Sequence, residues 1–160
     1  MPVLESKLDI RSEVFKTNKS DMLETLAQLQ ELYDEAAEGG GEEAVARIRK
    51  RGKMPIRERI SHVLDQDSPF LEISPLAAWR SSYDIGSGFV VGIGVIEGVE
   101  CVILGHDPSV RAGAFNPFNS KKLMRGLEIA RENRMPYVQF VESAGADLRG
   151  ASGDGKGDPN

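Results

Sequence analysis

Two short turns of small residues follow two predicted strands, and they are the best candidates for chemistry in this sequence. Arg111–Ala114 (RAGA) lies in the loop after the strand Cys101–Leu104, and Ser143–Ala146 (SAGA) follows the strand Tyr137–Val141. Strand ends in α/β proteins are common ligand sites, and small side chains let a ligand approach backbone N–H groups. Such groups stabilise developing negative charge, each contributing about 10²–10³ in rate. The residue types equally fit two ordinary tight turns, so both alternatives stay open.

A run of basic residues is the second candidate. It consists of Arg47, Arg49, Lys50, Arg51, Lys53, Arg57 and Arg59. The chain as a whole is acidic, with a formal net charge of −5, which argues against non-specific nucleic-acid binding. The run therefore indicates either a solvated helix face or a site for a phosphate-bearing ligand or an acidic partner.

Isolated histidines and the cysteine give weaker signals. His106 follows a predicted strand and is a possible catalytic base, although a structural histidine is the more common case. The single cysteine, Cys101, fits a buried strand position better than a nucleophile. One cysteine also excludes an intrachain disulfide and a cysteine-cluster metal site, and it is typical of a reducing, cytoplasmic compartment.

Three nucleotide- or metal-binding patterns are approached but not met. Gly150–Gly157 resembles a phosphate-binding loop, but Gly157 stands where a hydroxyl is needed and no apolar helix follows. The glycines of Gly92–Gly98 miss the dinucleotide spacing by one residue and lie inside a strand pattern. Asp154 and Asp158 lack the other ligands of a calcium loop. These patterns therefore predict flexible or structural segments.

The bulk composition is that of an ordinary globular domain. The 160 residues are 40% hydrophobic and 28% charged, enough for one domain with a sizeable core. The N-terminus has early charges and no apolar core, so we expect no signal peptide. No apolar run approaches the roughly 18 residues of a membrane span, so we expect no membrane association.

The N-terminal third predicts helices. Met1–Lys19 is weakly patterned and is expected to be a surface arm. Ser20 or Asp21 then caps a helix that ends at Gly39–Gly41, because glycine disfavours a helix interior. The apolar residues of this helix recur at helical spacing: Leu23, Leu26, Leu29, Leu32 and Tyr33. Two shorter helices are expected at Glu42–Arg51 and Ile56–Leu64.

The rest of the chain predicts strands and one further helix. The expected strands are Phe70–Ile73, Phe89–Ile96, Val99–Leu104 and Tyr137–Val141. Glu97–Gly98 makes the second and third a hairpin, although this is a weaker turn pair than Asn-Gly. Ser120 is expected to cap a helix whose apolar stripe contains Leu123, Leu127 and Ala130, flanked by Met124. From Gly150 onward no stable element is predicted, which is typical of a truncated domain.

Taken together, six segments resemble the carboxyltransferase β subunits of biotin-dependent acyl-CoA carboxylases, of the propionyl-CoA and methylcrotonyl-CoA type. The segments are Gly52–Ile60, Ser68–Leu76, Gly92–Gly94 with Gly98–Ile103, Lys121–Lys122, Glu128–Pro136 and Glu142–Ala146. The resemblance runs from about Arg51 to Arg149, and the order and spacing of the segments make it specific. It implies an α/β, crotonase-like superhelix, of which this chain is a truncated N-terminal half. Residues 1–52 would be an arm with helices and residues 53–160 a partial acyl-CoA domain.

The resemblance also implies a site. Ala144 and Gly145, with Ala146, would offer N–H groups to the thioester oxygen of an acyl-CoA as it becomes an enolate. Gly113 and Ala114 would line the acyl-CoA pocket, with Ser143 as a further substrate contact. Arg57 and Arg59 are the candidates for the CoA phosphates. The family usually has two glycines where this chain has Ala144 and Gly145, so a positive φ at Ala144 would be strained.

Cofactors and partners follow from the same resemblance. The chain has no biotin-accepting Met-Lys-Met, so biotin would arrive on a partner α subunit. The four-cysteine zinc ribbon of the bacterial acetyl-CoA carboxyltransferase β subunit is also missing, and no metal is expected. The resemblance further implies a homo-oligomer of full-length β subunits.

Two alternatives to a carboxyltransferase remain. The first is a non-catalytic assembly module that binds a carboxylase partner through the Leu23–Tyr33 stripe; exposure of this stripe would favour it. The second is another crotonase-like enzyme, a hydratase or decarboxylase, with Glu142 as its acid or base. A carboxyltransferase that relies on backbone N–H groups should tolerate Glu142→Gln.

Overall fold

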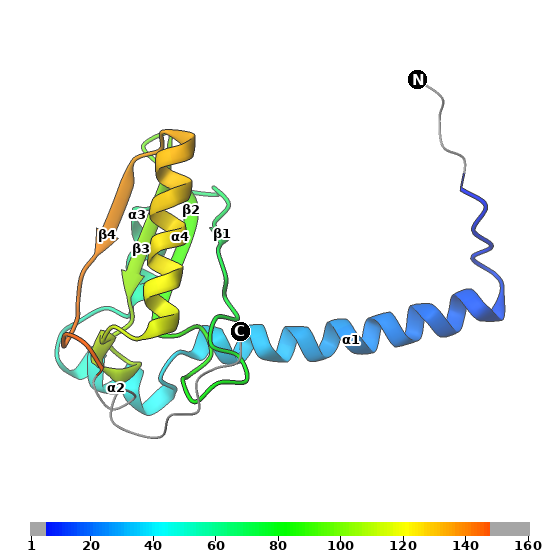
Figure 1. The fold of residues 1–160 in the computed structure, drawn as a ribbon, viewed down its shortest axis with the longest axis horizontal. Coiled ribbons are helices and arrows are strands. Elements are labelled where there is room, and N and C mark those ends of the chain that lie inside the picture. The colour runs from blue at the N-terminus through cyan, green and yellow to red at the C-terminus, as the bar shows by residue number, and fades with distance from the viewer. Residues whose placement is uncertain (1–5, 148–160) are drawn as a thin grey trace.

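The computed structural model describes residues 6–147, and it consists of a long helical arm attached to an α/β body (Figure 1). The helices are α1 (Glu13–Glu38), α2 (Glu42–Lys50), α3 (Ile56–Val63) and α4 (Pro117–Asn133). The strands are β1 (Leu71–Glu72), β2 (Phe89–Ile96), β3 (Val99–His106) and β4 (Tyr137–Phe140), and a 3₁₀ turn, η1, covers Arg111–Gly113. The order of elements therefore matches the α/β prediction.

The four strands form one mixed sheet in the order β1-β2-β3-β4. β1 and β3 both run antiparallel to β2, and β4 runs parallel to β3 after the α4 crossover. The predicted hairpin is confirmed, with Glu97 and Gly98 both at positive φ, as a type I′ turn requires. The Asp65 carboxylate accepts hydrogen bonds from the N–H groups of Glu97 (2.7 Å) and Gly98 (2.8 Å), which explains how a weak turn pair is held.

Helices cover both faces of the sheet, so the core has two halves. On one face α3 packs against the strands through Ile56, Ile60, Val90, Cys101 and Ile103. On the other face α4 packs through Phe89, Val91, Val102, Leu104 and Ala130. Alternate residues of β3 thus serve opposite faces, as the pleat demands. The expected burial of Cys101 is confirmed.

The start of α1 differs from the prediction. The helix begins at Glu13, where the Ser12 hydroxyl accepts a hydrogen bond from the Phe15 N–H at 3.2 Å, and it runs on to Glu38. The expected surface arm through Lys19 and the expected cap at Ser20 or Asp21 are therefore wrong. Serine and aspartate also tolerate helix interiors at an exposed position, so their types alone do not mark a start. The predicted end at Gly39 and the two shorter helices are confirmed within one residue.

The start and the buried face of α4 also differ from the prediction. Asn116, not Ser120, is the N-cap, and it forms a capping box with Asn119. The buried face contains Asn119, Lys122, Gly126 and Ala130, whereas Met124 and Leu127 are exposed. Polar residues occupy this face because they bind carbonyl groups of a distant loop, as described below.

Two further observations bear on the sequence-based expectations. Within residues 6–147, no helix is long and apolar enough to cross a membrane. The segment Gly150–Gly157, with Asp154, and also Asp158 lie outside the described residues.

Candidate functional site

The two small-residue turns meet at the carboxyl ends of the parallel strands β3 and β4. The Ala144 N–H donates to the Ala112 carbonyl at 3.1 Å. Phe115 forms a parallel bridge with Ala146, in which the Phe115 N–H donates to the Gly145 carbonyl at 2.7 Å and the Asp147 N–H donates to the Phe115 carbonyl at 2.8 Å. The structure therefore brings together the two segments that the sequence singled out.

The η1 turn is built from three successive residues with left-handed backbone. Arg111, Ala112 and Gly113 have φ values of 47°, 54° and 68°. A Cβ atom at position 113 would lie 2.0 Å from the Glu142 carbonyl oxygen, so only glycine fits this contact. Left-handed backbone at non-glycine residues costs about 1 kcal/mol or more each and often marks a functional site. The turn is thus a strained element pressed against the Glu142–Ala146 segment.

The second turn places its backbone strain on a glycine. Gly145 has a φ of 97°, and Ala144 has a negative φ. The backbone strain that a positive φ would cause at Ala144 is therefore absent, because the positive φ falls on Gly145 instead.

The three N–H groups of this turn have different partners. The Ala144 N–H is engaged by Ala112, and the Gly145 N–H donates to the neighbouring Ser143 hydroxyl at 3.1 Å. In a parallel bridge the central residue directs its own N–H away from the partner strand, so the Ala146 N–H points away from Phe115. Gly145 and Ala146 can therefore turn donors toward a ligand more readily than Ala144.

Arg111 holds the η1 turn to its surroundings. Its guanidinium donates to Asp84 (Nε to Oδ2, 2.9 Å), to Asp147 (Nη1 to Oδ2, 3.1 Å) and to the Ser82 carbonyl (3.2 Å), and it lies over the Tyr83 ring. The hydrogen bond with Asp84 is the largest cause of its raised pKa. Arg111 thereby links the loop before β2 to the segment after β4.

Glu142 is held by two cations at the edge of the site. Its carboxylate accepts hydrogen bonds from Lys53 (2.6 Å) and Arg59 (2.8 Å). The hydrogen bond from Lys53, followed by that from Arg59, lowers the pKa of Glu142. Both oxygens are occupied and the group stays ionised, so Glu142 is a poor general acid at neutral pH. The hydrogen bonds from Lys53 and Arg59 also make its carboxylate a weaker base than a free one.

Comparison with known proteins decides the family. The model of the Carboxyl transferase domain matches residues 47–156. The chain belongs to the carboxyl transferase domain family. It is 43% identical over 91% of its length to a probable biotin-dependent acyl-coenzyme A carboxylase beta2 subunit of Mycobacterium tuberculosis, and 41% identical over 91% to a mitochondrial methylcrotonoyl-CoA carboxylase beta chain of Dictyostelium discoideum.

Solved structures agree with this family. The β subunit of the geranyl-CoA carboxylase of P. aeruginosa aligns with 94% of the chain at 37% identity and a TM-score of 0.83. Transcarboxylase 12S, solved as a hexamer with methylmalonyl-coenzyme A, aligns with 80% at 28% identity and a TM-score of 0.74. The chain spans only 28% and 25% of the two curated relatives and 29% and 26% of the two solved chains. The predicted α/β carboxyltransferase fold is thus confirmed, and the chain forms only part of that fold.

The basic run of this carboxyl transferase domain is largely ion-paired. Arg57 donates twice to Glu72, at 2.7 and 3.1 Å, and Arg49 pairs with Glu58. Arg59 instead pairs with Glu142 at the site. The two arginines predicted to bind phosphates therefore have different carboxylate partners, although both keep part of their side chain exposed.

His106 is a structural residue in the carboxyl transferase fold. Its side chain is fully buried beneath η1, stacked on Phe89 with ring centroids 4.1 Å apart, and its Nε2 lies 3.1 Å from the Gln139 amide nitrogen. Burial lowers its pKa, so the ring stays neutral. The catalytic-base reading of His106 therefore finds no support in this geometry.

Sequence reasoning missed the polar residues of α4 that fix the loop below the site. Asn116 and Asn119 both donate to the Ser87 carbonyl at 3.0 Å, and Lys122 Nζ donates to the Phe89 carbonyl at 2.7 Å. Burial lowers the pKa of Lys122 to about 8, the nearby Glu72 carboxylate opposing the change. The Asn-Pro-x-Asn capping pattern was the available signal for the start of α4 at Pro117 and for the roles of Asn116 and Asn119, but not for the burial of Lys122.

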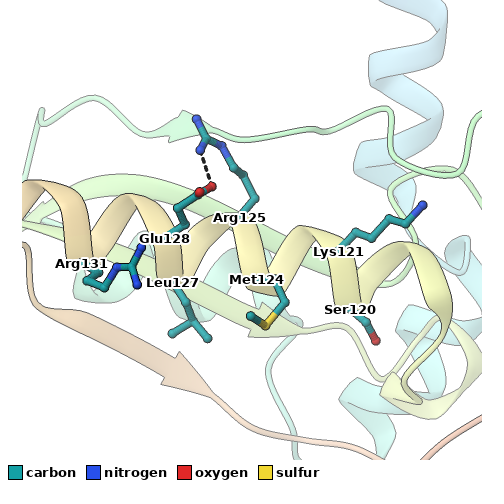
Figure 2. A pocket seen from close by; sticks show the side chains of 7 residues that line it. All are labelled: Ser120, Lys121, Met124, Arg125, Leu127, Glu128 and Arg131. Atoms are coloured by element: carbon teal, nitrogen blue, oxygen red, sulfur yellow. Dashed lines mark hydrogen bonds and ion pairs between the residues drawn. The ribbon is translucent and has the colours of Figure 1, made fainter.

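The outer face of α4 carries a groove away from the two turns. Figure 2 shows its lining, with Met124 and Leu127 projecting from the same side of the helix and Arg125 paired with Glu128 at 2.5 Å.

Across residues 6–147 no group of three or more His, Cys, Asp or Glu side chains is placed to hold a metal ion.

Proposed function

We propose that this chain is the acyl-CoA-binding part of a biotin-dependent carboxyltransferase. The reaction would move a carboxyl group to the α- or γ-carbon of an acyl-CoA. The observation that carries the proposal is the contact between the η1 turn and the Ser143–Ala146 turn at the ends of β3 and β4, in a member of the carboxyl transferase domain family. Named relatives that use acyl-CoA substrates add support.

The proposed chemistry rests on backbone N–H groups. Loss of a proton from the acyl carbon leaves negative charge on the thioester oxygen, and the N–H groups of Gly145 and Ala146 would stabilise it. For this, the hydrogen bond that the Gly145 N–H now donates to the Ser143 hydroxyl would have to break, so that this N–H can turn to the thioester oxygen. The Ala144 N–H would hold the turn in place through Ala112. The enolate carbon would then form the new bond to the carboxyl carbon while the bond from that carbon to its donor breaks, and the donor left behind would take up the proton lost from the acyl carbon.

Carboxybiotin, carried by a partner α subunit, would supply the carboxyl group when bound. Among the described residues, the backbone N–H donors of the Ser143–Ala146 turn suit the thioester oxygen of the acyl-CoA. Gly113 and Ala114 are buried behind the turn, whereas Ser143 is exposed. Substrate would therefore reach the turn from the Ser143 side, with Gly113 and Ala114 as the wall behind it.

Arg57 and Arg59 are proposed contacts for the CoA phosphates. Each keeps part of its guanidinium surface exposed while it is paired with a carboxylate, so a phosphate can be added to the same cation. We further propose a homo-oligomer of complete β subunits in the cytoplasm, with no metal cofactor. Transcarboxylase 12S, a solved hexamer, supports the oligomeric part.

A role in assembly is the second candidate function. The observation that favours it is the exposure of Leu23, Leu26 and Tyr33 on α1. The two functions are compatible, since the arm and the turns occupy different parts of the chain.

The test of the carboxyltransferase proposal is to delete one N–H donor without moving the turn. Ala146→Pro removes an N–H that the parallel bridge does not use, whereas Ala146→Gly keeps it. In the complete subunit with its biotin-carrying partner, kcat should fall by about 10²–10³ for the proline variant and stay within a few-fold for the glycine variant. Equal activity of the two variants, with unchanged circular dichroism, would overturn the proposed role.

A further inference from the structure

Both ends of the Ser143–Ala146 turn are held by the η1 turn. At one end the Ala144 N–H donates to the Ala112 carbonyl at 3.1 Å. At the other end the carboxylate of Asp147, the residue after the turn, accepts a hydrogen bond from the Arg111 guanidinium (Nη1 to Oδ2, 3.1 Å). Because both contacts come from neighbouring residues of η1, the position of η1 sets the position of the N–H groups that lie between them.

The Arg111 side chain also ties η1 to the loop before β2. Its Nε donates to the Asp84 carboxylate at 2.9 Å, its Nη2 donates to the Ser82 carbonyl at 3.2 Å, and its guanidinium carbon lies 4.7 Å from the centroid of the Tyr83 ring. All three guanidinium nitrogens are therefore engaged. The backbone of Arg111 and Ala112 is left-handed, which is unfavourable for residues that carry a Cβ atom, so η1 needs such external contacts to keep its shape.

Asp147 is the more deeply buried member of its ion pair with Arg111. Its side chain is 2% exposed, against 28% for Arg111 and 51% for Asp84. A buried carboxylate is costly unless a cation and hydrogen bonds compensate it, so removal of the guanidinium drives such a group toward water. Since Asp147 adjoins the Ser143–Ala146 turn in sequence, its movement toward water would displace the N–H donors of that turn.

We propose that Arg111 is a positioning residue for carboxyl transfer, and that it holds the Ser143–Ala146 turn in its active geometry through Asp147. The proposal rests on the proposed function of the turn and adds a residue that acts on the turn from behind. A displacement of about 1 Å in a site can cost about 10²-fold in rate. Loss of Arg111 should therefore lower kcat much more than it weakens substrate binding.

Steady-state kinetics of the complete subunit with its biotin-carrying partner test the proposal, with methylcrotonyl-CoA and propionyl-CoA as substrates. Arg111→Met should lower kcat by about 10–100-fold and leave the KM for the acyl-CoA within about twofold, with an unchanged circular dichroism spectrum. Arg111→Lys should resemble it, because one ammonium group cannot replace the planar fork that binds three partners.

The matched control is Arg125→Met, which breaks the exposed Arg125–Glu128 pair on the outer face of α4. It should change kcat and KM by no more than about twofold, since exposed ion pairs contribute little. Equal kcat values for Arg111→Met and this control would overturn the proposal. A raised KM with an unchanged kcat would assign Arg111 to substrate binding and would also overturn it.

A double variant tests whether Arg111 acts through Asp147. Asp147→Asn removes the charge that Arg111→Met leaves buried, so the kcat of the double variant should equal or exceed that of Arg111→Met alone. Independent roles of the two residues would instead multiply their separate losses. A multiplied loss would contradict the coupling of Arg111 to the turn through Asp147.

Amide hydrogen exchange in the 160-residue chain tests the proposal without an activity assay. In Arg111→Met, the N–H groups of Ala144 and Phe115, which join the two turns, should exchange at least about tenfold faster, and the Val102 N–H in the sheet should be unaffected. If the unmodified complete subunit transfers no carboxyl group, the proposed function fails, and these exchange rates alone decide whether Arg111 holds the turn. Unchanged exchange at Ala144 and Phe115 would overturn the proposal in either case.

Discussion

The buried ammonium group of Lys122 makes a quantitative prediction about stability. The side chain is 1% exposed, it donates to the Phe89 and Gly86 carbonyls, and its Nζ lies 3.9 Å from Glu72. Burial is the main cause of the lowered pKa, about 8 against an ordinary 10.5. At 1.36 kcal/mol per pKa unit, the protonated form costs the folded state about 3 kcal/mol at neutral pH.

The sign follows from proton binding. The folded chain holds this proton more weakly than the unfolded chain, so between pH 8 and 10.5 the unfolded chain binds more protons. The free energy of unfolding therefore rises with pH through this interval, by about 2–3 kcal/mol from this group. Lys122→Met removes the contribution and leaves the other titrating groups in place.

Urea unfolding of the unmodified chain and of Lys122→Met at pH 7 and pH 10 measures this contribution. The unmodified chain should gain stability relative to the variant by about 2–3 kcal/mol over this range. Subtraction cancels other groups that titrate there. Parallel stability curves for the two proteins would refute the assignment of a buried, weakly held proton to Lys122.

Three further predictions concern the site and its support. Glu142→Gln in the complete subunit should leave carboxyl transfer within a few-fold in a steady-state assay; loss of all activity with the fold intact would instead indicate an acid or base role. Burial lowers the pKa of His106, so below about pH 6.5 this residue binds a proton more readily in the unfolded chain than in the folded chain. The free energy of unfolding should therefore fall as the pH is lowered. His106→Phe should weaken this fall in urea unfolding, and an unchanged pH profile would contradict the reasoning. Gly113→Ala should destabilise by roughly 3 kcal/mol because of the contact with the Glu142 carbonyl, whereas Gly98→Ala, at a similar φ but in open space, should cost about 1 kcal/mol; equal losses would show that the contact is unimportant.

Local patterns were enough to predict the elements that local chemistry determines. Valine and isoleucine runs on either side of Glu97–Gly98 predicted the hairpin, and the glycines of Gly39–Gly41 predicted the end of α1. The start of α1 was missed because Ser12, Ser20 and Asp21 are equally good caps by type. Only the observed backbone distinguishes them.

The errors in α4 and at the site come from contacts between distant segments. Lys122 is buried because the Phe89 carbonyl, 33 residues away, accepts its hydrogen bond, and no periodicity rule anticipates this. The two small-residue turns were predicted one by one. Their contact depends on the parallel register of β3 and β4, and the direction of the Ala146 N–H depends on the bridge with Phe115.

The most direct measurement is an experimental structure of the complete subunit with an acyl-CoA bound. The account predicts that the thioester oxygen lies about 2.7–3.1 Å from the backbone nitrogens of Gly145 and Ala146. A thioester oxygen that makes no contact with the Ser143–Ala146 turn, in a complex that is competent for carboxyl transfer, would contradict the central claim.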